Sequence, residues 1–539
     1  MANSFYWYDL ETSGLSPKWD RIVQFAGCRT DAELNLLDDE YITYVSLPDD
    51  VLPNPNATLV TGITPSILES HGIREIDALR NISNSMSEPG TCVVGYNNLR
   101  FDDEFIRYSF YRNFLDPYSR EWKNGNSRWD LLDLVRATGA LRRDGINWPQ
   151  DEDGLPVYKL EELTKHNGIE HGSAHDALSD VRATIGMAKL IYQNHPKIFE
   201  YYFALRDKKQ VRKILEPYGI KTCLHISGIY PRARFGVAPV ISLARHPTNN
   251  NAVIVADLAE DIDSLISMTS EEIKSRLYSK DFEDRLPLRE IRINRCPFVV
   301  GFDVLTSENI DRLKIDMRIV EDRAKKLRQP GVGQKIASAF EQPDRDANTD
   351  VDTALYEGFL QDEDRSRCSS FHQALEKGDY PMLDFKDKRL TVLLERLKMR
   401  SFAEFASDQE KQDWSDWVRQ KLLAEGDHLN LKKFIRTVDN FPIDGISFRD
   451  ITSLIETPEA FIKTCDELTK LTKNFGADIV ASIESRGFIF AGSVANDLSL
   501  PFVLARKPGK LPNETHQKSF DLEYGSTSIE IQKNTSISV

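Results

Sequence analysis

The stretch FYWYDLE at residues 5–11 joins a run of aromatic residues to two acids, Asp9 and Glu11. Its aromatic half is typical of a buried β-strand. Because residues i and i+2 of a strand point to the same face, both carboxylates leave this strand side by side. Two such charges destabilise a fold unless a cation lies between them, and a divalent metal ion with oxygen ligands is the natural cation. Such ions serve phosphoryl chemistry, although an edge strand with two solvated acids would give the same pattern.

The length and composition of the chain limit the class of protein. Its 539 residues, 40% of them hydrophobic, are enough for several domains with hydrophobic cores. A net charge of −15 argues against a polybasic protein and against binding to anionic membranes, but it allows a nucleic-acid enzyme with a local cationic surface. The six scattered cysteines have no zinc-binding spacing and are typical of reduced thiols. With no signal peptide and no apolar window of transmembrane length, we expect a soluble cytoplasmic protein with no membrane partner.

Predicted strands and helices divide the chain into four regions. Residues 1–192 alternate strand-like and helix-like segments, which is an α/β pattern. The segments predicted there are strands at 22–28, 41–45 and 92–96 and helices at 104–114, 131–137 and 177–192. Short apolar runs then predict a small β-barrel over 196–348, and a polar stretch at 342–352 predicts its end. Residues 352–432 have helical periodicity, and α/β texture returns over 433–539.

Three consecutive acids, Asp102, Asp103 and Glu104, follow the strand predicted at 92–96 and open a predicted helix. Acids at this position lie at the carboxyl end of a strand, which is the edge where open α/β sheets place their sites. Taken alone, three acids in a row are better explained as compensation of the helix dipole.

A histidine and an acid accompany the helix predicted at 177–192. In the segment GSAHDALSD (172–180), His175 falls in the loop or first turn, where the helix dipole favours the neutral, basic imidazole. Asp180 lies about one and a half turns further on and can reach the same cleft. A single histidine before a helix is usually a surface residue, but H-x4-D after a D-x-E strand and an N-x3-F-D turn indicates one shared site.

These motifs lie within longer strings that resemble a known family. DLET (9–12), NNLRFDDEF (97–105) and HDALSDV (175–181) resemble the histidine-bearing branch of the DEDD exonuclease superfamily. Further strings resemble the bacterial exodeoxyribonuclease I family up to about residue 425, among them TLVTGITP (58–65), SRWDLLDLVRATGALR (127–142), HISG (225–228) and VDTALYEGF (351–359). The resemblance implies a ribonuclease H-like exonuclease domain over 1–192, a Src-homology-3-like barrel over 196–348 and a helical domain over 352–432.

The resemblance also implies a mechanism and partners. Asp9, Glu11, Asp102 and Asp180 would hold two Mg²⁺ ions, with Mn²⁺ as an alternative, and His175 would act as general base on the attacking water. The implied activity is 3′→5′ digestion of single-stranded DNA to nucleoside 5′-monophosphates, in DNA repair and recombination. The implied partners are the 3′ end of single-stranded DNA and the acidic C-terminal tail of single-stranded DNA-binding protein, and we expect a monomer.

Several residues are candidates for binding the DNA strand. Glu11, Leu10 and Thr12 are expected near the terminal nucleotide, with Leu10 in place of a residue that is often aromatic in the family. Lys159 replaces an arginine of the family, so the charge is kept but the bidentate phosphate fork is lost. Specificity for single strands needs base stacking and local positive charge, for which the candidates are Arg107, Arg112, Arg128, Trp129, Arg142 and Arg143. For most of these, helix-surface charge or a place in the core is the alternative explanation.

The last hundred residues resemble a different family. FPIDGISFRDIT (441–452), ASIESRGFIF (481–490) and ARKPGKLPNETH (505–516) are similar to the N-terminal two-thirds of adenine phosphoribosyltransferase, which implies an incomplete α/β segment over 433–539. Such enzymes need a Thr-Gly-Gly-Thr loop whose backbone amides hold the ribose phosphate, and the chain ends at Val539 before such a motif. We therefore expect no transferase activity from this chain alone, and an unpaired sheet edge.

Three functions remain to be compared. The first is the exonuclease, and the second is an adenine phosphoribosyltransferase with a large N-terminal partner, which would require the missing loop. The third is a catalytically inactive DNA-binding or scaffold protein. That function predicts the loss of at least one catalytic side chain, and all five are present, namely Asp9, Glu11, Asp102, His175 and Asp180.

Overall fold

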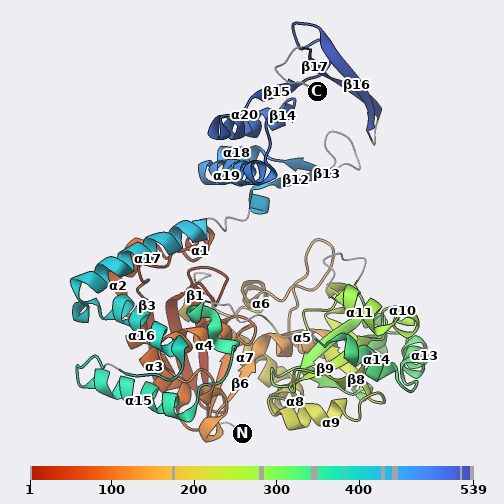
Figure 1. The fold of residues 1–539 in the computed structure, drawn as a ribbon. Helices are drawn as coiled ribbons and strands as arrows, with labels where there is room; N and C mark the ends of the chain where they lie inside the picture. Colours follow the sequence, from red (N-terminus) through yellow and green to blue (C-terminus); the bar gives the residue numbers. More distant parts are fainter. Residues whose placement is uncertain are drawn as a thin grey trace. The chain divides into compact units, whose positions relative to one another are not determined.

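Figure 1 shows the fold, which is that of a computed structural model. The structure describes residues 3–172, 176–277, 285–341, 350–381, 383–426, 431–439, 447–522 and 525–533. The chain forms two compact units, Met1–Trp414 and Ser415–Val539, each of which has its own secondary structure. No helix in the described part of the chain is both long enough and apolar enough to cross a membrane.

A six-stranded sheet forms the centre of the N-terminal region, and β1 lies inside it. In spatial order the strands are β4 (Gly72–Ile73), β3 (Leu36–Val45), β2 (Ile22–Thr30), β1 (Ser4–Thr12), β5 (Thr91–Gly95) and β6 (Ser127–Asp130). β1 pairs antiparallel with β2 and parallel with β5, and β5 pairs parallel with β6. The strands predicted at 22–28, 41–45 and 92–96 are confirmed. The acidic stretch at 9–11 therefore belongs to an inner strand and not to a solvated edge.

Helices cover both faces of this sheet. They are α1 (Pro55–Thr61), α2 (Pro65–His71), α3 (Glu75–Ser87), α4 (Asp102–Arg112), α5 (Leu131–Leu141), α6 (Leu160–His166) and α7 (Ala177–Asn194). On one face of β1, Trp7 shares a core with Trp129 and with α7, whereas Tyr8 and Leu10 share the opposite core with Phe25 and with α4. The aromatic run at 5–8 is thus explained by a strand that is buried on both faces.

The next region is built on a five-stranded antiparallel sheet, as the Src-homology-3-like prediction requires. In spatial order its strands are β10 (Leu288–Arg292), β9 (Ala252–Asp257), β8 (Val237–Arg245), β7 (Thr222–Ile226) and β11 (Phe298–Val300). Its helices and those that lead into it are α8 (Pro196–Ala204), α9 (Lys208–Leu215), α10 (Asp263–Ser267), α11 (Ser270–Leu277), α12 (Ser307–Leu313), α13 (Met317–Leu327) and α14 (Val332–Ala339). Most of the boundary predicted at 342–352 lies outside the described residues.

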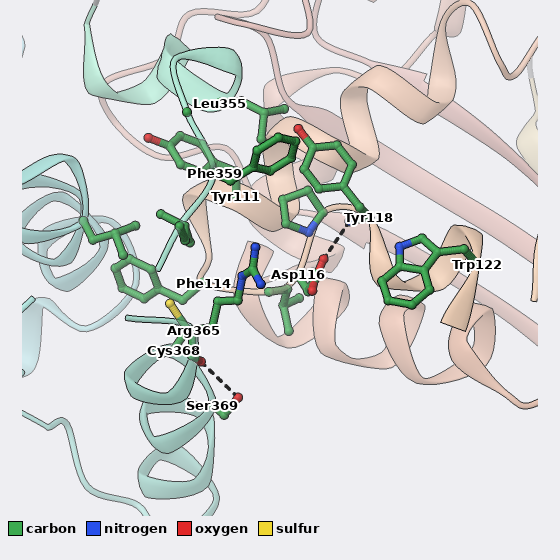
Figure 2. A pocket seen from close by; sticks show the side chains of 15 residues that line it. Tyr111, Phe114, Asp116, Tyr118, Trp122, Leu355, Phe359, Arg365, Cys368 and Ser369 are labelled. Carbon is green, nitrogen blue, oxygen red and sulfur yellow. Dashed lines mark hydrogen bonds between the residues drawn. The ribbon is translucent and has the colours of Figure 1, made fainter. Parts of the chain in front are cut away.

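A helical region follows and packs on the exonuclease-like region. It contains the 3-10 helix η5 (Val351–Tyr356) and the helices α15 (Asp362–Glu376), α16 (Lys388–Ser401) and α17 (Asp408–Gly426), the last of which spans the division between the two units. Residues 350–360, which we call the strap, pass over α4 and the segment that follows α4, and then lead into α15. A hollow of about 290 Å³ lies there. Figure 2 shows that Leu355 and Phe359 of the strap face Tyr111 and Tyr118 across it.

The C-terminal unit has a small α/β arrangement. Its elements are β12 (Arg436–Asp439), β13 (Ser447–Asp450), α18 (Thr452–Glu456), α19 (Pro458–Phe475), β14 (Val480–Ile483), α20 (Arg486–Leu498), β15 (Phe502–Ala505), β16 (Thr515–Leu522) and β17 (Gly525–Gln532). β14 and β15 form a two-stranded parallel sheet, while β12 with β13 and β16 with β17 form antiparallel pairs. Among the described strands, β14 pairs with β15 alone, in agreement with the expected unpaired edge.

Candidate active site

Strand β1 and helix α7 bring three carboxylates together. Asp9 and Glu11 leave β1 on the same face as Trp7, which is the face that shares its core with α7. Asp180 lies in the first turn of α7. Oxygen atoms of Asp9, Glu11 and Asp180 all lie within 4.8 Å of one another. The structure therefore gathers three of the four predicted metal ligands into one acidic cluster.

Burial and repulsion between neighbouring charges raise the pKa values of two of these carboxyls, Asp9 and Glu11. Burial raises the pKa of Asp9 well above its ordinary value of 3.8, and the charges of Asp102, Asp180 and Glu11 raise it further. Burial, followed by the charges of Asp180 and Asp176, raises the pKa of Glu11 from 4.5 to about 8. A cation within the cluster would remove this repulsion. Because every donor is a carboxylate oxygen, the cluster fits hard divalent ions such as Mg²⁺ and Mn²⁺.

Asp102 approaches the acidic cluster from the end of β5. It is the first residue of α4 and is 4% exposed. Burial, and then the charges of Asp103, Asp130 and Glu11, raise its pKa, and its own charge raises the pKa of Asp9. Asp102 does not belong to the group whose oxygens lie within 4.8 Å of one another. Asp102, the fourth predicted ligand, therefore lies close enough to Asp9 to repel it, but outside the group of three carboxylates.

The loop before α7 carries two histidines. The predicted base, His175, lies outside the described residues. The other, His171, was not singled out from the sequence, and its Nε2 lies 2.5 Å from Oδ1 of Asp180, while its Nδ1 lies 3.0 Å from Oγ1 of Thr164. Donation to an ionised Asp180 requires the proton on Nε2 of His171, because an ionised carboxylate only accepts hydrogen bonds. The sequence offered one signal that could have identified His171, namely that a second histidine lies close to His175 before the same helix.

The geometry can be compared with known proteins. Three family models match the chain: Exonuclease over residues 6–188, Exonuclease I SH3-like domain over 206–342, and Exonuclease I C-terminal domain over 349–451. Exodeoxyribonuclease I of Haemophilus influenzae is 43% identical over 428 residues, which are 78% of this chain and 90% of the relative. The chain belongs to the exodeoxyribonuclease I family. Exodeoxyribonuclease I of Escherichia coli is 42% identical over 431 residues, again with 78% of this chain and 90% of the relative covered.

Solved structures of exonuclease I have the same fold. E. coli exonuclease I in complex with a dA16 oligonucleotide matches with a TM-score of 0.75 at 36% identity, covering 92% of this chain and 99% of that chain. The apo form of exonuclease I matches with a TM-score of 0.71 at 35% identity. The family therefore explains the ribonuclease H-like, Src-homology-3-like and helical regions together.

The C-terminal part of the chain is similar to a second family. Adenine phosphoribosyltransferase of Pelagibacter ubique is 46% identical over 107 residues, which are 20% of this chain and 61% of the relative. The Mannheimia succiniciproducens enzyme is 54% identical over 101 residues, or 56% of its length. The similarity predicted for the tail is confirmed as a partial one.

Lys159, one of the residues predicted to contact the DNA strand, is exposed at the start of α6. It lines a hollow of about 580 Å³ between the exonuclease-like and Src-homology-3-like regions. Arg136 and Arg232 line the same hollow, and so do the acids Asp151, Glu161 and Glu162, so charges of both signs are balanced in number there. Arg136 pairs with Asp133 and Arg232 with Asp151, so an anionic ligand would meet the exposed Lys159 rather than these two guanidinium groups.

Two of the predicted DNA-binding arginines of this family member are paired inside the protein. Arg107 forms a bidentate pair with Glu121, at 2.8 and 2.9 Å. Arg128 is 6% exposed and donates to Asp103 at 2.7 Å and to the carbonyl of Asn294 at 3.2 Å. Because both guanidinium groups already have carboxylate partners, a direct role on DNA stays a prediction.

Three other candidates lie within the core or at its edge. Leu10 is 5% exposed and its side chain packs in the core on the face of β1 opposite Asp9, so its place near the terminal nucleotide stays a prediction. Trp129 is fully buried and packs among aromatic residues, so it cannot stack on DNA. Thr12 is 7% exposed, and its hydroxyl donates to the carbonyl of Gly14 at 2.7 Å. The strand period, which sends alternate side chains to opposite faces, explains why Leu10 turns away.

The remaining arginines differ in their access to solvent. Arg112 is 2% exposed and donates to the carbonyls of Pro17 and Lys18, so it is a structural residue. Arg143 donates to the carbonyl of Gly139. Arg142 donates to the carbonyl of Val304 at 3.1 Å and lines a separate hollow of about 620 Å³ together with Lys197 and Tyr201.

Proposed function

We propose that this chain is a divalent-metal-dependent 3′→5′ exonuclease that degrades single-stranded DNA to nucleoside 5′-monophosphates. The observation that carries the proposal is the acidic cluster of Asp9, Glu11 and Asp180, whose oxygens lie within 4.8 Å of one another in a member of the exodeoxyribonuclease I family. The E. coli structures with DNA oligonucleotides support the choice of substrate.

In this proposal the carboxylates of Asp9, Glu11, Asp102 and Asp180 hold two Mg²⁺ ions, or Mn²⁺ in their place. When bound, such ions polarise the scissile phosphate, lower the pKa of a bound water and neutralise the leaving 3′-oxygen. His175 accepts the proton of the attacking water, as the family resemblance implies. Glu11 and Asp102 are buried and Asp9 and Asp180 are half-buried, so a cation among them would be partly shielded from bulk water and held more strongly.

The substrate strand would be held by charge outside the acidic cluster. Lys159, exposed beside a hollow whose two arginines are paired with acids, is the candidate there for a phosphate contact. The separate hollow with Arg142 and Lys197 combines cationic and apolar side chains, among them Tyr201. This chemistry suits the acidic tail of single-stranded DNA-binding protein, which we propose as a partner. We further propose a monomer that acts in DNA repair and recombination in the cytoplasm, a compartment that suits six buried, unpaired cysteines.

The test is digestion of a 3′-labelled single strand by the full-length chain, with Mg²⁺ or with EDTA. We expect nucleoside 5′-monophosphates with Mg²⁺, no product with EDTA, and little product from a duplex. Asp180→Ala should lower the rate by at least a hundredfold, because several kcal/mol of metal stabilisation are lost and each 1.4 kcal/mol is about a factor of ten. Asp153→Asn, which changes an exposed acid on a turn, is the matched control and should digest normally. Release that continues in EDTA, or in Asp180→Ala, would exclude the proposal.

A further inference from the structure

The three consecutive acids of α4 have three different environments. Asp102 faces the acidic cluster, and Asp103 is fully buried between Arg120 and Arg128, each at 2.7 Å. The hydroxyl of Tyr8, the residue before Asp9, also donates to Asp103 at 2.8 Å. These contacts fix one side of the first turn of α4 to β1 and β6. Compensation of the helix dipole therefore accounts for only part of this acidic run.

Glu104 fixes the other side of this turn to two distant parts of the chain. Its Oε1 accepts from Arg295 at 2.7 Å, across 191 residues, and from Arg107 at 3.0 Å. Its Oε2 accepts from the hydroxyl of Tyr356 at 2.5 Å, across 252 residues. The side chain of Glu104 is 14% exposed, whereas those of its partners are more open to water, at 31% for Arg295 and 54% for the whole residue Tyr356. One carboxylate thus joins the exonuclease-like, Src-homology-3-like and helical regions.

Arg295 belongs to a connection that is held in place by several contacts. It lies between β10 and β11, where the carbonyl of Asn294 accepts from Arg128 and the thiol of Cys296 donates to the backbone carbonyl of Arg128. The hydroxyl of Tyr202 donates to the carbonyl of Cys296 at 2.8 Å. These contacts fix the backbone on both sides of Arg295 and so hold its guanidinium group against Glu104.

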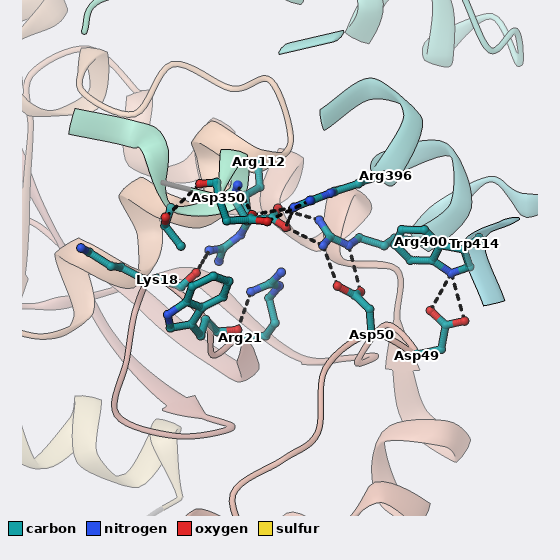
Figure 3. Close-up of polar contacts among 12 residues, drawn as sticks. Lys18, Arg21, Asp49, Asp50, Arg112, Asp350, Arg396, Arg400 and Trp414 are labelled. Carbon is teal, nitrogen blue, oxygen red and sulfur yellow. Dashed lines mark hydrogen bonds and ion pairs between the residues drawn. The ribbon is translucent and has the colours of Figure 1, made fainter. Parts of the chain in front are cut away.

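Tyr356 belongs to the strap, which is also held at both ends. At its start, Asp350 and Asp352 pair with Arg396 of α16, and Asp352 pairs with Arg400 as well (Figure 3). At its other end, the ring of Tyr356 packs edge-on against that of Tyr108 of α4, with centroids 5.8 Å apart. The strap is thus anchored to α16 and meets α4 at Glu104, within one turn of Asp102, and at Tyr108 in the next turn.

Asp102 depends on this turn for its position. In the part of the chain that the structure describes, its carboxylate forms no hydrogen bond with another side chain. A metal ligand without such a partner is oriented by its backbone, and a displacement of about 1 Å can cost about a hundredfold in rate. Since Glu104 is two residues away in the same turn, its contacts bear directly on where Asp102 points.

We propose that Glu104 is a positioning residue through which Arg295 and Tyr356 set the orientation of Asp102 at the metal site. The inference rests on the proposed function for its kinetic readout but not for its metal-binding readout. When the Src-homology-3-like region and the strap are docked, the turn is held from both sides and Asp102 is aimed at the acidic cluster. Loss of either partner leaves a largely buried carboxylate partly unpaired and loosens the turn.

The test uses three variants of the full-length chain and one control. Arg295→Met removes the positive charge that faces Glu104, and Arg295→Lys restores that charge without a guanidinium group. Tyr356→Phe removes only the hydroxyl that donates to Glu104. Arg292→Met is the matched control, because Arg292 ends β10 three residues before Arg295 and pairs with Glu290 instead of Glu104. The first readout is Mn²⁺ affinity without DNA, measured by electron paramagnetic resonance. The second readout is kcat and KM on a single-stranded oligonucleotide.

We expect Arg295→Met and Tyr356→Phe each to weaken Mn²⁺ binding and lower kcat by about tenfold, with KM little changed, as for other residues that orient metal ligands. Arg295→Lys should recover most of both losses, and Arg292→Met should match the wild type. Melting temperatures identify variants that fail to fold. If Arg295→Met is one of them, Tyr356→Phe still tests the inference. Unchanged Mn²⁺ affinity and kcat in Tyr356→Phe and in folded Arg295→Met would overturn the inference. A wild type that binds Mn²⁺ but releases no nucleotide would instead exclude the proposed function.

Discussion

Nε2 of His171 lies 2.5 Å from Oδ1 of Asp180, and this contact links the loop before α7 to the acidic cluster. On its other side the imidazole meets the hydroxyl of Thr164, which also lies 2.9 Å from the carbonyl of Leu160. The ring is therefore held between α6 and α7. Since Asp180 is a metal ligand in the proposed mechanism, His171 orients that ligand in the way that hydrogen-bonded neighbours commonly do.

Replacement of His171 should impair metal binding without unfolding the protein. We expect His171→Phe to lower kcat on single-stranded DNA and the affinity for Mn²⁺ by about ten- to a hundredfold, because Asp180 loses the donor that fixes its rotamer. Single-turnover digestion and Mn²⁺ titration measure the two effects. His166→Phe, at a half-exposed histidine on α6, is the control and should leave both unchanged. Equal behaviour of the two variants would mean that the contact with Asp180 has no role.

The raised carboxyl pKa values predict an unusual dependence of stability on pH in metal-free protein. Burial raises the pKa of Glu11 from 4.5 to about 8, so between these values the folded state binds more protons than the unfolded state. The free energy of unfolding should therefore be highest below about pH 4.5 for this group and fall as the pH rises toward 8. Chemical denaturation in EDTA from pH 5 to pH 9 measures the slope.

Glu11→Gln provides the comparison for this pH prediction, because glutamine does not titrate. In EDTA, the free energy of unfolding of the wild type, minus that of Glu11→Gln, should fall as the pH rises. Mg²⁺ should restore the stability of the wild type at the upper end of the pH range. A difference that is flat or rises with pH would contradict the raised pKa of Glu11.

The ion pairs in Figure 3 predict how firmly the helical region is attached. Arg400 is held by Asp50 at 2.6 and 2.9 Å and by Asp352 at 2.8 Å, and all three side chains are at most 6% exposed. Arg400→Met would leave buried carboxylates short of a positive partner, which should cost about 3–5 kcal/mol in the free energy of unfolding. Urea denaturation followed by tryptophan fluorescence reports this unit, because six of the seven tryptophans lie within residues 1–414.

Arg365→Met is the control for the Arg400 prediction. Arg365 is half-exposed and pairs with Asp362, which is almost fully exposed, so its replacement should change the urea midpoint very little. If both variants unfold at the midpoint of the wild type, the pairs around Arg400 do not hold the helical region.

The tail should have no adenine phosphoribosyltransferase activity. The chain covers 56–61% of the length of the transferases that it resembles, and its 539 residues contain no Thr-Gly-Gly-Thr loop to hold the ribose phosphate. We expect no conversion of adenine in the presence of phosphoribosyl pyrophosphate, measured with labelled adenine and with an intact transferase as positive control. Turnover above background would show that the tail supplies the missing contacts in another way.

The amino-acid sequence determined the parts of this protein that depend on local pattern. Strand period places Asp9 and Glu11 on one face, apolar spacing predicts α4 and α7, and the strings around Asp102 and Asp180 identify the family. These features repeat over a few residues, so neighbouring residues are enough to predict them. The acidic cluster was accordingly expected from the sequence, except that Asp102 lies beside it.

Only the tertiary structure decided which charged groups pair with each other. Arg107 and Arg128 are as basic in the sequence as Arg142, yet the first two are paired with Glu121 and Asp103 inside the protein. Glu104 meets partners 191 and 252 residues away, which no local pattern predicts. The physical reason is that a charge acts on whatever lies within a few ångströms of it, and folding, not sequence distance, brings those groups together.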